Sequence, residues 1–317
     1  MELADWQAFI PRNSLVALKP NLGLDILIPG AISAPWVVEG VIKVLQGYVS
    51  KIYMVESDQV VVNAEKALRI SGLDKVCAKY NIEWMNMSQG RFVRMQDDRR
   101  LILKDVYIPE ILTKTELITL PLMKTHNKST ITGALKNQWG CLETLRHNFH
   151  LVISQALVDV NTIVQPRFAV MDATIGLEGN GPKSGIPKEM GLVLAGADLV
   201  ALDAVASSIM GFNPAQIEHL NLCARHGLGT NDINAIEIAG IGIDDVKTRF
   251  QPARHNVISF LELALRKSTI RWLVFDTHLF RLMCFGTRRY YNVWDMFYGR
   301  RLRNRVLADS HYGAQWR

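Results

Sequence analysis

The order of hydrophobic and polar positions in the first 240 residues predicts strands and helices that alternate along the chain. Short apolar runs are typical of buried strands, whereas apolar residues spaced three and four apart predict amphipathic helices. We interpret seven runs as strands: Leu15–Leu18, Lys51–Val55, Ile82–Met85, Leu117–Leu120, Arg167–Met171, Gly191–Ala195 and Ala235–Ile238. The predicted helices are Pro35–Leu45, Ala64–Ile70, Asp74–Tyr80, Leu151–Val158, Asp198–Met210 and Pro214–Arg225. This alternation predicts an α/β fold with a mostly parallel sheet and flanking helices.

Local signals indicate where several of these elements begin and end. Ser33 and Asp198 each stand where an N-cap is expected, and Gly47 follows the last apolar position of the first helix. Residues Arg91–Tyr107 predict a β-hairpin with charged residues at its tip, and Gly176–Gly185 a glycine-rich loop. The Gly191–Ala195 strand is expected to be buried.

The chain has 317 residues, enough for two domains, and its charge is unevenly spread. We expect one α/β lobe over residues 1–123, a second over 124–245, and a helical extension over 246–317. The extension carries 12 arginines and two lysines against four carboxylates, a net charge of +10, whereas the other residues sum to −4. This asymmetry indicates that the extension contacts something different from what the body binds.

Composition excludes several classes of protein. With 49% hydrophobic and 21% charged residues, the chain has an ordinary globular composition, which excludes disordered, collagen-like and small disulfide-stapled proteins. The four cysteines are each more than 60 residues from the next, so no local iron–sulfur or zinc motif is present. The first residues lack the basic and apolar parts of a secretory signal, and we expect a cytoplasmic protein or one at the cytosolic face of a membrane.

The first polar segment, Lys124–Asn137, follows a predicted strand and is rich in hydroxyl, amide and lysine side chains. This is the composition of a site that binds an anion through backbone N–H groups, hydroxyl donors and an ammonium group. The alternative is a polar loop that caps a helix. In the first interpretation His126 is the acid–base residue, and the substrate-binding residues are Lys124, Thr132, Lys136 and Asn137.

The second polar segment, Asp172–Gly185, contains four glycines just past a predicted strand. Glycines allow the backbone to approach a ligand closely, which makes Gly179 and Gly181 candidate binding residues. Asp172 and Glu178 are carboxylates suited to acid–base catalysis or to a hard cation. The alternative is a surface loop with turn glycines, and nearby prolines exclude a dinucleotide-binding fingerprint.

Two further features concern metal and buried charge. His147 and His150 have a spacing that can chelate a divalent metal, with His126 as third ligand only if the fold brings it near. Capping or core histidines are the alternative. Asp203 stands in an otherwise apolar helix, and a buried carboxylate there needs a polar partner.

Several blocks together resemble the "domain of unknown function 362" (DUF362) family, in the family's order between about Ser14 and Ile243. The blocks are Leu18–Asn21, Pro35–Leu45, Met54–Asp58, Leu122–His126, Thr132–Asn137, Asp172–Pro182 and Ala195–Ala204. Many members add a ferredoxin-like module with two four-iron clusters, which implies redox chemistry. This chain lacks those cysteines, so we expect no iron–sulfur cluster from it, and redox chemistry would take electrons from a partner. The Thr132–Asn137 block is also similar to a segment of the nickel-dependent lactate racemase family, which implies acid–base chemistry beside a carbonyl.

These observations favour a small-molecule enzyme with its site in a cleft between the two lobes. Its substrate would be anionic, bearing a phosphate or carboxylate, and the chemistry acid–base or redox-linked; Lys19, Asn21 and Glu56 complete the expected site. The alternative is an accessory or assembly factor that docks on a partner or membrane through the basic extension. A homo-oligomer, a redox partner and a divalent metal stay open, and nucleic acid is the least favoured partner.

The extension has apolar stretches that charged residues interrupt, so it does not predict a membrane-spanning helix. We expect an ordered, helical segment whose Trp and Phe side chains are largely buried against protein. The alternative is a peripheral position in a membrane interface, with arginines on anionic lipid headgroups.

Overall fold

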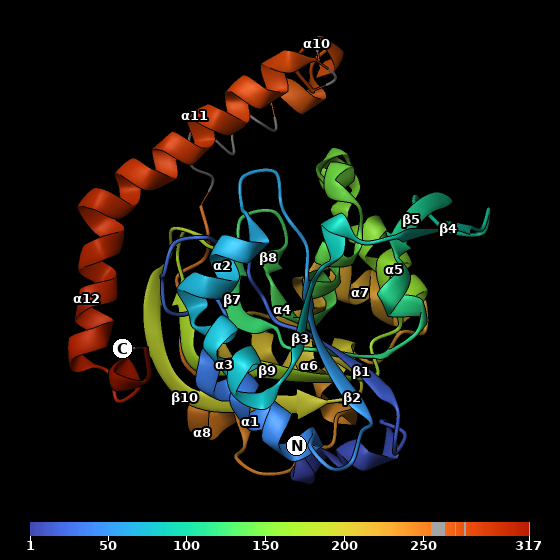
Figure 1. Cartoon of the computed structure of the whole chain (residues 1–317), viewed down its shortest axis with the longest axis vertical. Helices are drawn as coiled ribbons and strands as arrows, with labels where there is room; N and C mark the ends of the chain where they lie inside the picture. The colour runs from blue at the N-terminus through green and yellow to red at the C-terminus, as the bar shows by residue number, and fades with distance from the viewer. Residues whose placement is uncertain (255–263, 270, 276, 317) are drawn as a thin grey trace.

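The computed structural model describes residues 1–254, 264–269, 271–275 and 277–316. Side chains at six positions fall outside this description: Thr144, Leu145, His147, Arg271, Trp272 and Arg281. The body is an α/β fold built on one mostly parallel eight-stranded sheet, and a long helical arm follows it (Figure 1). The predicted fold class is therefore confirmed.

The hydrogen-bonded strand order is β3-β2-β1-β6-β9-β7-β8. Strands β6 and β7 follow one another along one edge of β9, and β10 pairs along its other edge. Its strands are β1 (Leu15–Lys19), β2 (Lys51–Glu56), β3 (Glu83–Asn86), β6 (Glu116–Thr119), β7 (Leu122–His126), β8 (Thr130–Ile131), β9 (Phe168–Glu178) and β10 (Ile186–Gly196). Only β8 and β10 run antiparallel to their neighbours. A separate hairpin, β4 (Phe92–Gln96) with β5 (Asp105–Pro109), matches the hairpin expected from the sequence. The expected border between two lobes, at residues 123 and 124, falls inside β7.

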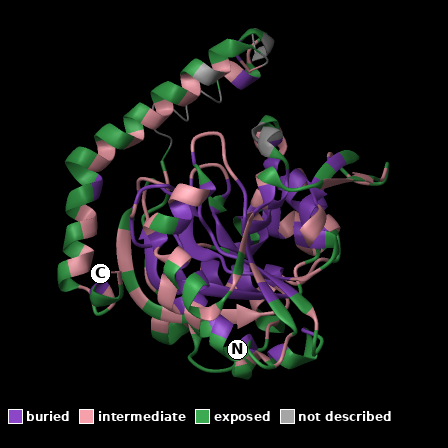
Figure 2. Cartoon of the chain, viewed as in Figure 1, coloured by how far each residue is buried: buried purple, intermediate pink, exposed green. Residues whose placement is uncertain are grey.

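Helices cover both faces of the sheet (Figure 1). Those of the body are α1 (Pro35–Leu45), α2 (Ala64–Ser71), α3 (Leu73–Tyr80), α4 (Gly133–Asn137), α5 (Ile153–Val164), α6 (Leu199–Ile209), α7 (Glu218–Arg225) and α8 (Ile243–Val246). Alternate residues of β1 divide between the layers: Val16 and Leu18 pack with α1–α3, and Ala17 packs with α5. Burial follows this layering, because the sheet is enclosed and the arm is largely exposed or half-buried (Figure 2).

A break at Pro121 separates two strands where the sequence predicted one. β6 pairs with the start of β9, through Ile118 and Phe168, whereas β7 pairs further along it, through Leu122 and Asp172. Proline has no N–H to donate, and here its carbonyl accepts a hydrogen bond from the Asp172 N–H, 2.9 Å away. The break lets β7 continue beyond the end of β6.

Strand β9 is longer than predicted, and this changes the glycine-rich segment. The strand runs through Asp172 to Glu178, so Asp172 lies in mid-strand, and the turn spans only residues 179–185. Gly176 lies within the strand, and a Cβ there would be 2.9 Å from the Phe250 ring and 3.1 Å from the Met123 carbonyl oxygen, so the absence of a side chain lets both approach.

Three smaller expectations were wrong. The segment around Gly191–Ala195 belongs to β10, whose other edge has no strand partner in the described residues, and it is half-exposed rather than buried. Residues 235–238 form no strand; a 3-10 turn ends at Ala235. Ala34, not Ser33, is the N-cap of α1, because the Ser33 hydroxyl instead accepts a hydrogen bond from the Asn21 N–H at 2.7 Å. Asp198 caps α6 as predicted and accepts from the Ala201 N–H at 2.8 Å.

The arm contains α10 (Arg271–Phe275), α11 (His278–Trp294), a π-helical turn (Asp295–Gly299) and α12 (Arg300–Asp309). It is helical, as expected. In the extension expected from the sequence Phe250 is buried and Phe275 and Phe280 are half-buried, but Phe285 and Phe297 are 56% and 55% exposed, so the expected burial is wrong for these two. The reason is that the arm contacts the body along one side only. No helix in the described part of the chain combines the length and apolar character that crossing a bilayer requires.

The end of the arm is attached to α1 by aromatic contacts. Tyr312 stacks on Trp36 with ring centroids 5.7 Å apart, and Trp316 meets the same indole edge-on at 5.1 Å. An ion pair between Arg288 and Asp25, at 2.7 Å, attaches the middle of α11.

Asp203 has the polar partner that its burial demands. Its carboxylate accepts hydrogen bonds from the N–H groups of Ala134 and Leu135, at 2.5 and 2.9 Å, and so holds the first turn of α4. Gly133 has a φ of +61°, and a Cβ there would overlap the carboxylate. Burial raises the pKa of Asp203 to about 7.

We predict that Asp203→Ala lowers the free energy of unfolding by about 3 kcal/mol, because two buried N–H groups lose their acceptor. Urea denaturation followed by circular dichroism measures this change. The control is Asn63→Ala, which removes an exposed helix cap that accepts from the Lys66 N–H and should cost about 1 kcal/mol. Equal, small losses in both variants would show that the carboxylate does not hold α4.

Candidate functional site

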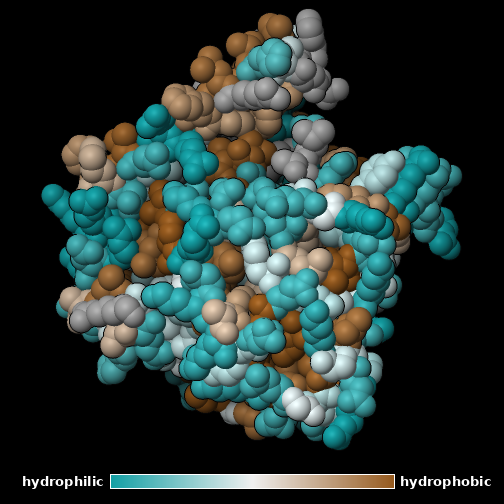
Figure 3. All heavy atoms as spheres, viewed as in Figure 1, coloured by the Kyte–Doolittle hydropathy of each residue, from teal (hydrophilic) through white to brown (hydrophobic). Residues whose placement is uncertain are grey.

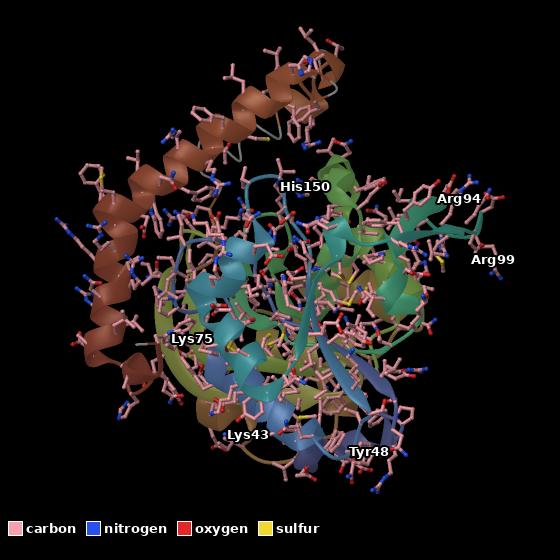
Figure 4. All side chains as sticks on the ribbon, viewed as in Figure 1. Lys43, Tyr48, Lys75, Arg94, Arg99 and His150 are labelled. Atoms are coloured by element: carbon pink, nitrogen blue, oxygen red, sulfur yellow. The ribbon has the colours of Figure 1, made fainter. Side chains whose placement is uncertain are left out.

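A cavity of about 520 Å³ lies between the carboxyl ends of the parallel strands and the arm. Ligands of open α/β sheets bind at this edge, and the volume is typical of small-molecule sites. Strands β1, β2 and β7, helix α4 and the 179–185 turn contribute its floor, and α11 contributes its roof. His150 lies on the side of the body that faces α11, whereas Arg94 and Arg99 point away on the β4–β5 hairpin (Figure 4).

A buried ion pair forms the deepest part of the floor. The Lys19 ammonium at the end of β1 lies 2.9 Å from the Glu56 carboxylate at the end of β2, and both side chains are almost fully buried. A Cβ on Gly140 would lie 2.7 Å from Lys19 Nζ and 2.6 Å from Glu56 Oε1, so a side chain here would displace the ion pair. The pair compensates its own charges, which leaves other side chains to hold an anion.

A chain of hydrogen bonds fixes Lys124 beside this pair. The Lys124 ammonium donates to Asn21 Oδ1 at 2.8 Å and to the Ala31 carbonyl at 2.9 Å. The Asn21 amide in turn donates to Asn137 Oδ1 at 3.0 Å, and the Asn137 amide donates to Thr119 Oγ1 at 2.8 Å. Burial, with Lys136 and Lys183 nearby, lowers the pKa of Lys124 to about 7.

Lys136 and Lys183 complete the cationic floor from two different segments. Burial, together with Lys128 and Arg146, lowers the pKa of Lys136 to about 7, and burial lowers that of Lys183 to about 8. Among the residues that the structure describes, no hydrogen-bond acceptor reaches the Lys136 ammonium; it lies 5.7 Å from the centre of the Trp139 ring. Lys136 is therefore the cation best placed to contact a ligand.

His126 lines the same cavity as a neutral ring. Burial and the nearby Lys136 and Lys128 lower the pKa of His126 well below its usual value. Its Nδ1 accepts a hydrogen bond from the Lys128 N–H at 3.0 Å. The ring proton therefore resides on Nε2, and His126 presents a hydrogen-bond donor rather than a base.

Of the two histidines expected as metal ligands, the structure describes the side chain of His150. His150 Nδ1 lies 2.7 Å from the Lys128 ammonium, and its ring stacks on Trp139 at 6.0 Å. In the described part of the chain, no three His, Cys, Asp or Glu side chains are grouped to hold a metal. The side chain of His147 lies outside the described residues. The excess of positive charge around His150 opposes a further cation.

The structure places the two expected catalytic carboxylates away from the cavity lining. Asp172 accepts hydrogen bonds from the Ala34 N–H at 3.3 Å and from the Thr174 N–H and hydroxyl at 2.9 and 2.7 Å. Glu178 pairs with Lys188 at 3.3 Å and accepts from the Gln251 N–H at 3.1 Å. Both carboxylates thus have partners that join segments of the body.

Gly179 and Gly181, expected to bind a ligand, instead let the turn pack closely against the backbone of β7. A Cβ on Gly181 would overlap the Thr125 carbonyl, and the Gly179 carbonyl accepts from the Thr125 hydroxyl at 3.0 Å. These contacts hold the 179–185 turn against β7 and bring Lys183 to the cavity. Thr132 does line the cavity, and its buried hydroxyl has no hydrogen-bond partner among the described residues.

The cavity lining contains nine of the residues expected from the sequence and four further cations that were not expected. The nine are Lys19, Asn21, Glu56, Lys124, His126, Thr132, Lys136, Asn137 and His150. Those added are Lys128, Arg146, Lys183 and Arg266. Lys128 and Lys183 stood in the two polar segments and could have been chosen for their charge. Nothing local distinguishes Arg146, which is buried and donates to the Asp58 carbonyl at 2.8 Å, or Arg266, whose guanidinium lies 4.0 Å from the centre of the Phe275 ring.

Comparison with known proteins places this site in a family. A family model described as "Domain of unknown function (DUF362)" matches residues 16–208. The thylakoid-associated protein sll1697 of Synechocystis is 29% identical over 234 residues, which cover 70% of each chain. The range matched by the family model contains Lys19, Lys124, Lys136 and Lys183, whereas Arg266 and the arm follow it. Since the match extends over more than half of the sequence, the chain belongs to the DUF362 family.

Proposed function

We propose that the protein is an enzyme that binds a small anionic molecule, bearing a phosphate or a carboxylate, in this cavity. The observation that carries the proposal is the charge of the lining. Five lysines and two arginines contribute to it, and Glu56 is the sole carboxylate among its described residues. Glu56 pairs with Lys19, whereas Lys124, Lys136 and Lys183 form no ion pair with a described carboxylate. Burying such ammonium groups is costly, so an anion that entered would offset an electrostatic penalty already present.

The lining also suggests how the chemistry would proceed. Lys136 has a pKa near 7, which makes its amine able to give or take a proton at neutral pH. The neutral His126 ring, with its proton on Nε2, would donate to an oxygen of the substrate. In this proposal Lys136 takes over the proton-transfer role that the sequence assigned to His126, and the fixed Lys124 ammonium orients the anion.

We predict that sulfate binds wild-type protein at pH 6.5 and that Lys136→Met weakens this binding by about tenfold or more. The reason is that a charge-assisted hydrogen bond of about 1.5–3 kcal/mol is lost. Isothermal titration calorimetry gives the dissociation constant. Lys43→Met is the control, since Lys43 is exposed on α1 and should leave it unchanged. No binding of sulfate or phosphate to the wild type would refute the proposed site.

The pH dependence of this binding has a definite sign. The pKa values of Lys124, Lys136 and Lys183 are lowered, so these ammonium groups are charged below about pH 7 to 8 and lose protons above it. Sulfate keeps its charge over this range, so we predict that its affinity falls as pH rises from 6 to 9. Binding near pH 8 should take up protons, which calorimetry in buffers of different ionisation enthalpy detects. An affinity that stays constant, with no proton uptake, would contradict the lowered pKa values.

A second candidate function is peripheral contact with a membrane, favoured by the outer side of the arm. Four apolar side chains recur there at helical spacing and are more than half exposed: Leu282, Phe285, Val293 and Met296. Exposed arginines accompany them, among them Arg289, Arg300 and Arg301. The relative in Synechocystis is named for an association with thylakoids. Apolar and basic side chains together favour an anionic lipid surface.

We predict that the full chain sediments with vesicles containing phosphatidylglycerol at low salt, and less so at high salt, because screening weakens the arginine contacts. The double variant Phe285→Ser/Val293→Ser should reduce sedimentation severalfold. Leu3→Ser is the control, since Leu3 is equally exposed but lies at the opposite end of the chain. Unchanged sedimentation of the double variant would exclude this side of α11 as the contact.

A further inference from the structure

The two sides of the cavity differ in chemistry. Its floor carries the cations described above, whereas the arm contributes Phe275, Phe280 and Met283, and the loop after β2 contributes Val60 and Val61. These apolar side chains are half-buried, and they face the same space as the lysines. Hydrophobic side chains gather along α10 and the start of α11, where the arm overhangs the body (Figure 3).

The apolar roof is not part of the protein's hydrophobic core. Further along the arm, Tyr291 and Trp294 pack on a core cluster that includes Leu24 and Ile28. Phe275, Phe280 and Met283, by contrast, join none of the core clusters formed by described residues. The C-terminal half of α11 is therefore packed on the body, and its N-terminal half lines the cavity with apolar side chains that no core cluster of the described residues includes.

The cationic floor and the apolar roof do not compensate one another energetically. Cations lose hydration beside apolar side chains without gaining a counter-charge, and apolar side chains gain little from packing near ammonium groups. A molecule with an anionic group at one end and an apolar body at the other would satisfy both. The volume of about 520 Å³ also exceeds what an inorganic anion alone requires.

We propose that the ligand of this cavity is an anionic amphiphile, with its phosphate or carboxylate on Lys136 and Lys183 and its apolar chain against Phe280 and Met283. This inference rests on the proposed anion site and adds the class of molecule that occupies it. The outer side of α11 plays no part in it, because Leu282 points away from the cavity and is 65% exposed.

The test uses n-alkyl phosphates of increasing chain length, from butyl to octyl, at concentrations below micelle formation. Their dissociation constants for the full chain are measured by calorimetry and compared with that of inorganic phosphate. Each pair of added carbons should raise the affinity by about fivefold to fifteenfold, since burying one methylene contributes about 0.8 kcal/mol. Octyl glucoside, which has the chain without the anion, should bind far more weakly than octyl phosphate.

Two adjacent positions of α11 provide matched variants. Met283→Ser should flatten the dependence on chain length and leave the affinity for inorganic phosphate unchanged, because it alters only the roof. Leu282→Ser removes a similar side chain from the outer side and should behave as the wild type. Lys136→Met should weaken every phosphate, whatever its chain.

The possible outcomes distinguish failure of the amphiphile proposal from failure of the proposed anion site. If inorganic phosphate binds and alkyl chains add nothing, the amphiphile is excluded and the anion site stands. If Met283→Ser keeps the full dependence on chain length, the roof does not hold the chain and the inference fails. If no phosphate binds at all, the proposed function fails, and the inference falls with it.

Discussion

The concentration of positive charge at one edge of the sheet is the constraint on which much of the structure depends. Parallel strands bring Lys19 and Lys124 to this edge, and helix α4 and the 179–185 turn add Lys136 and Lys183. Like charges enclosed together repel, so the surroundings must compensate them. Among the described residues, the Glu56 carboxylate compensates Lys19, the Asn21 and Ala31 oxygens accept hydrogen bonds from Lys124, and Asp25 acts on Lys183 from further away. The remaining charge is what makes the cavity selective for anions in our proposal.

Much of this arrangement follows from features that lie outside the cavity. Asp203, on α6, fixes the first turn of the helix that presents Lys136. Gly140 lets the backbone pass over the ion pair, and Gly181 lets the turn that carries Lys183 lie against β7. Asp203 and Gly181 do not line the cavity, and Gly140 lines it without a side chain, yet each helps to set the position of a cation. The backbone of the floor is therefore positioned by the same contacts that hold the body together.

The sequence predicted most of the elements and many of the residues that line the cavity, because both signals are local. Apolar periodicity marked most strands and helices, and polar residues after strands marked Lys19, Glu56 and Lys124. Two facts are not local: which partner a carboxylate finds, and which segments meet. Asp172 was predicted to be catalytic because the strand was expected to end beside it. Strand β9 instead continues past Asp172, whose carboxylate accepts hydrogen bonds from the Ala34 and Thr174 N–H groups. Arg146 and Arg266 carry no sequence signal, since only the fold brings them to the cavity.

The arm is translated after the body, so it must dock on a cationic edge that is already formed. The body is complete before the arm leaves the ribosome, and until then the cationic edge faces water, which hydrates and screens its charges. When the arm docks, it replaces some of that water with the side chains of Phe280 and Met283. Docking is therefore opposed by the very charges it covers, and is favoured by the Arg288–Asp25 ion pair and by the stacking of Tyr312 on Trp36. The docking of the last helices therefore carries a desolvation cost, which comes from the cations that the first two hundred residues bring to the edge of the sheet.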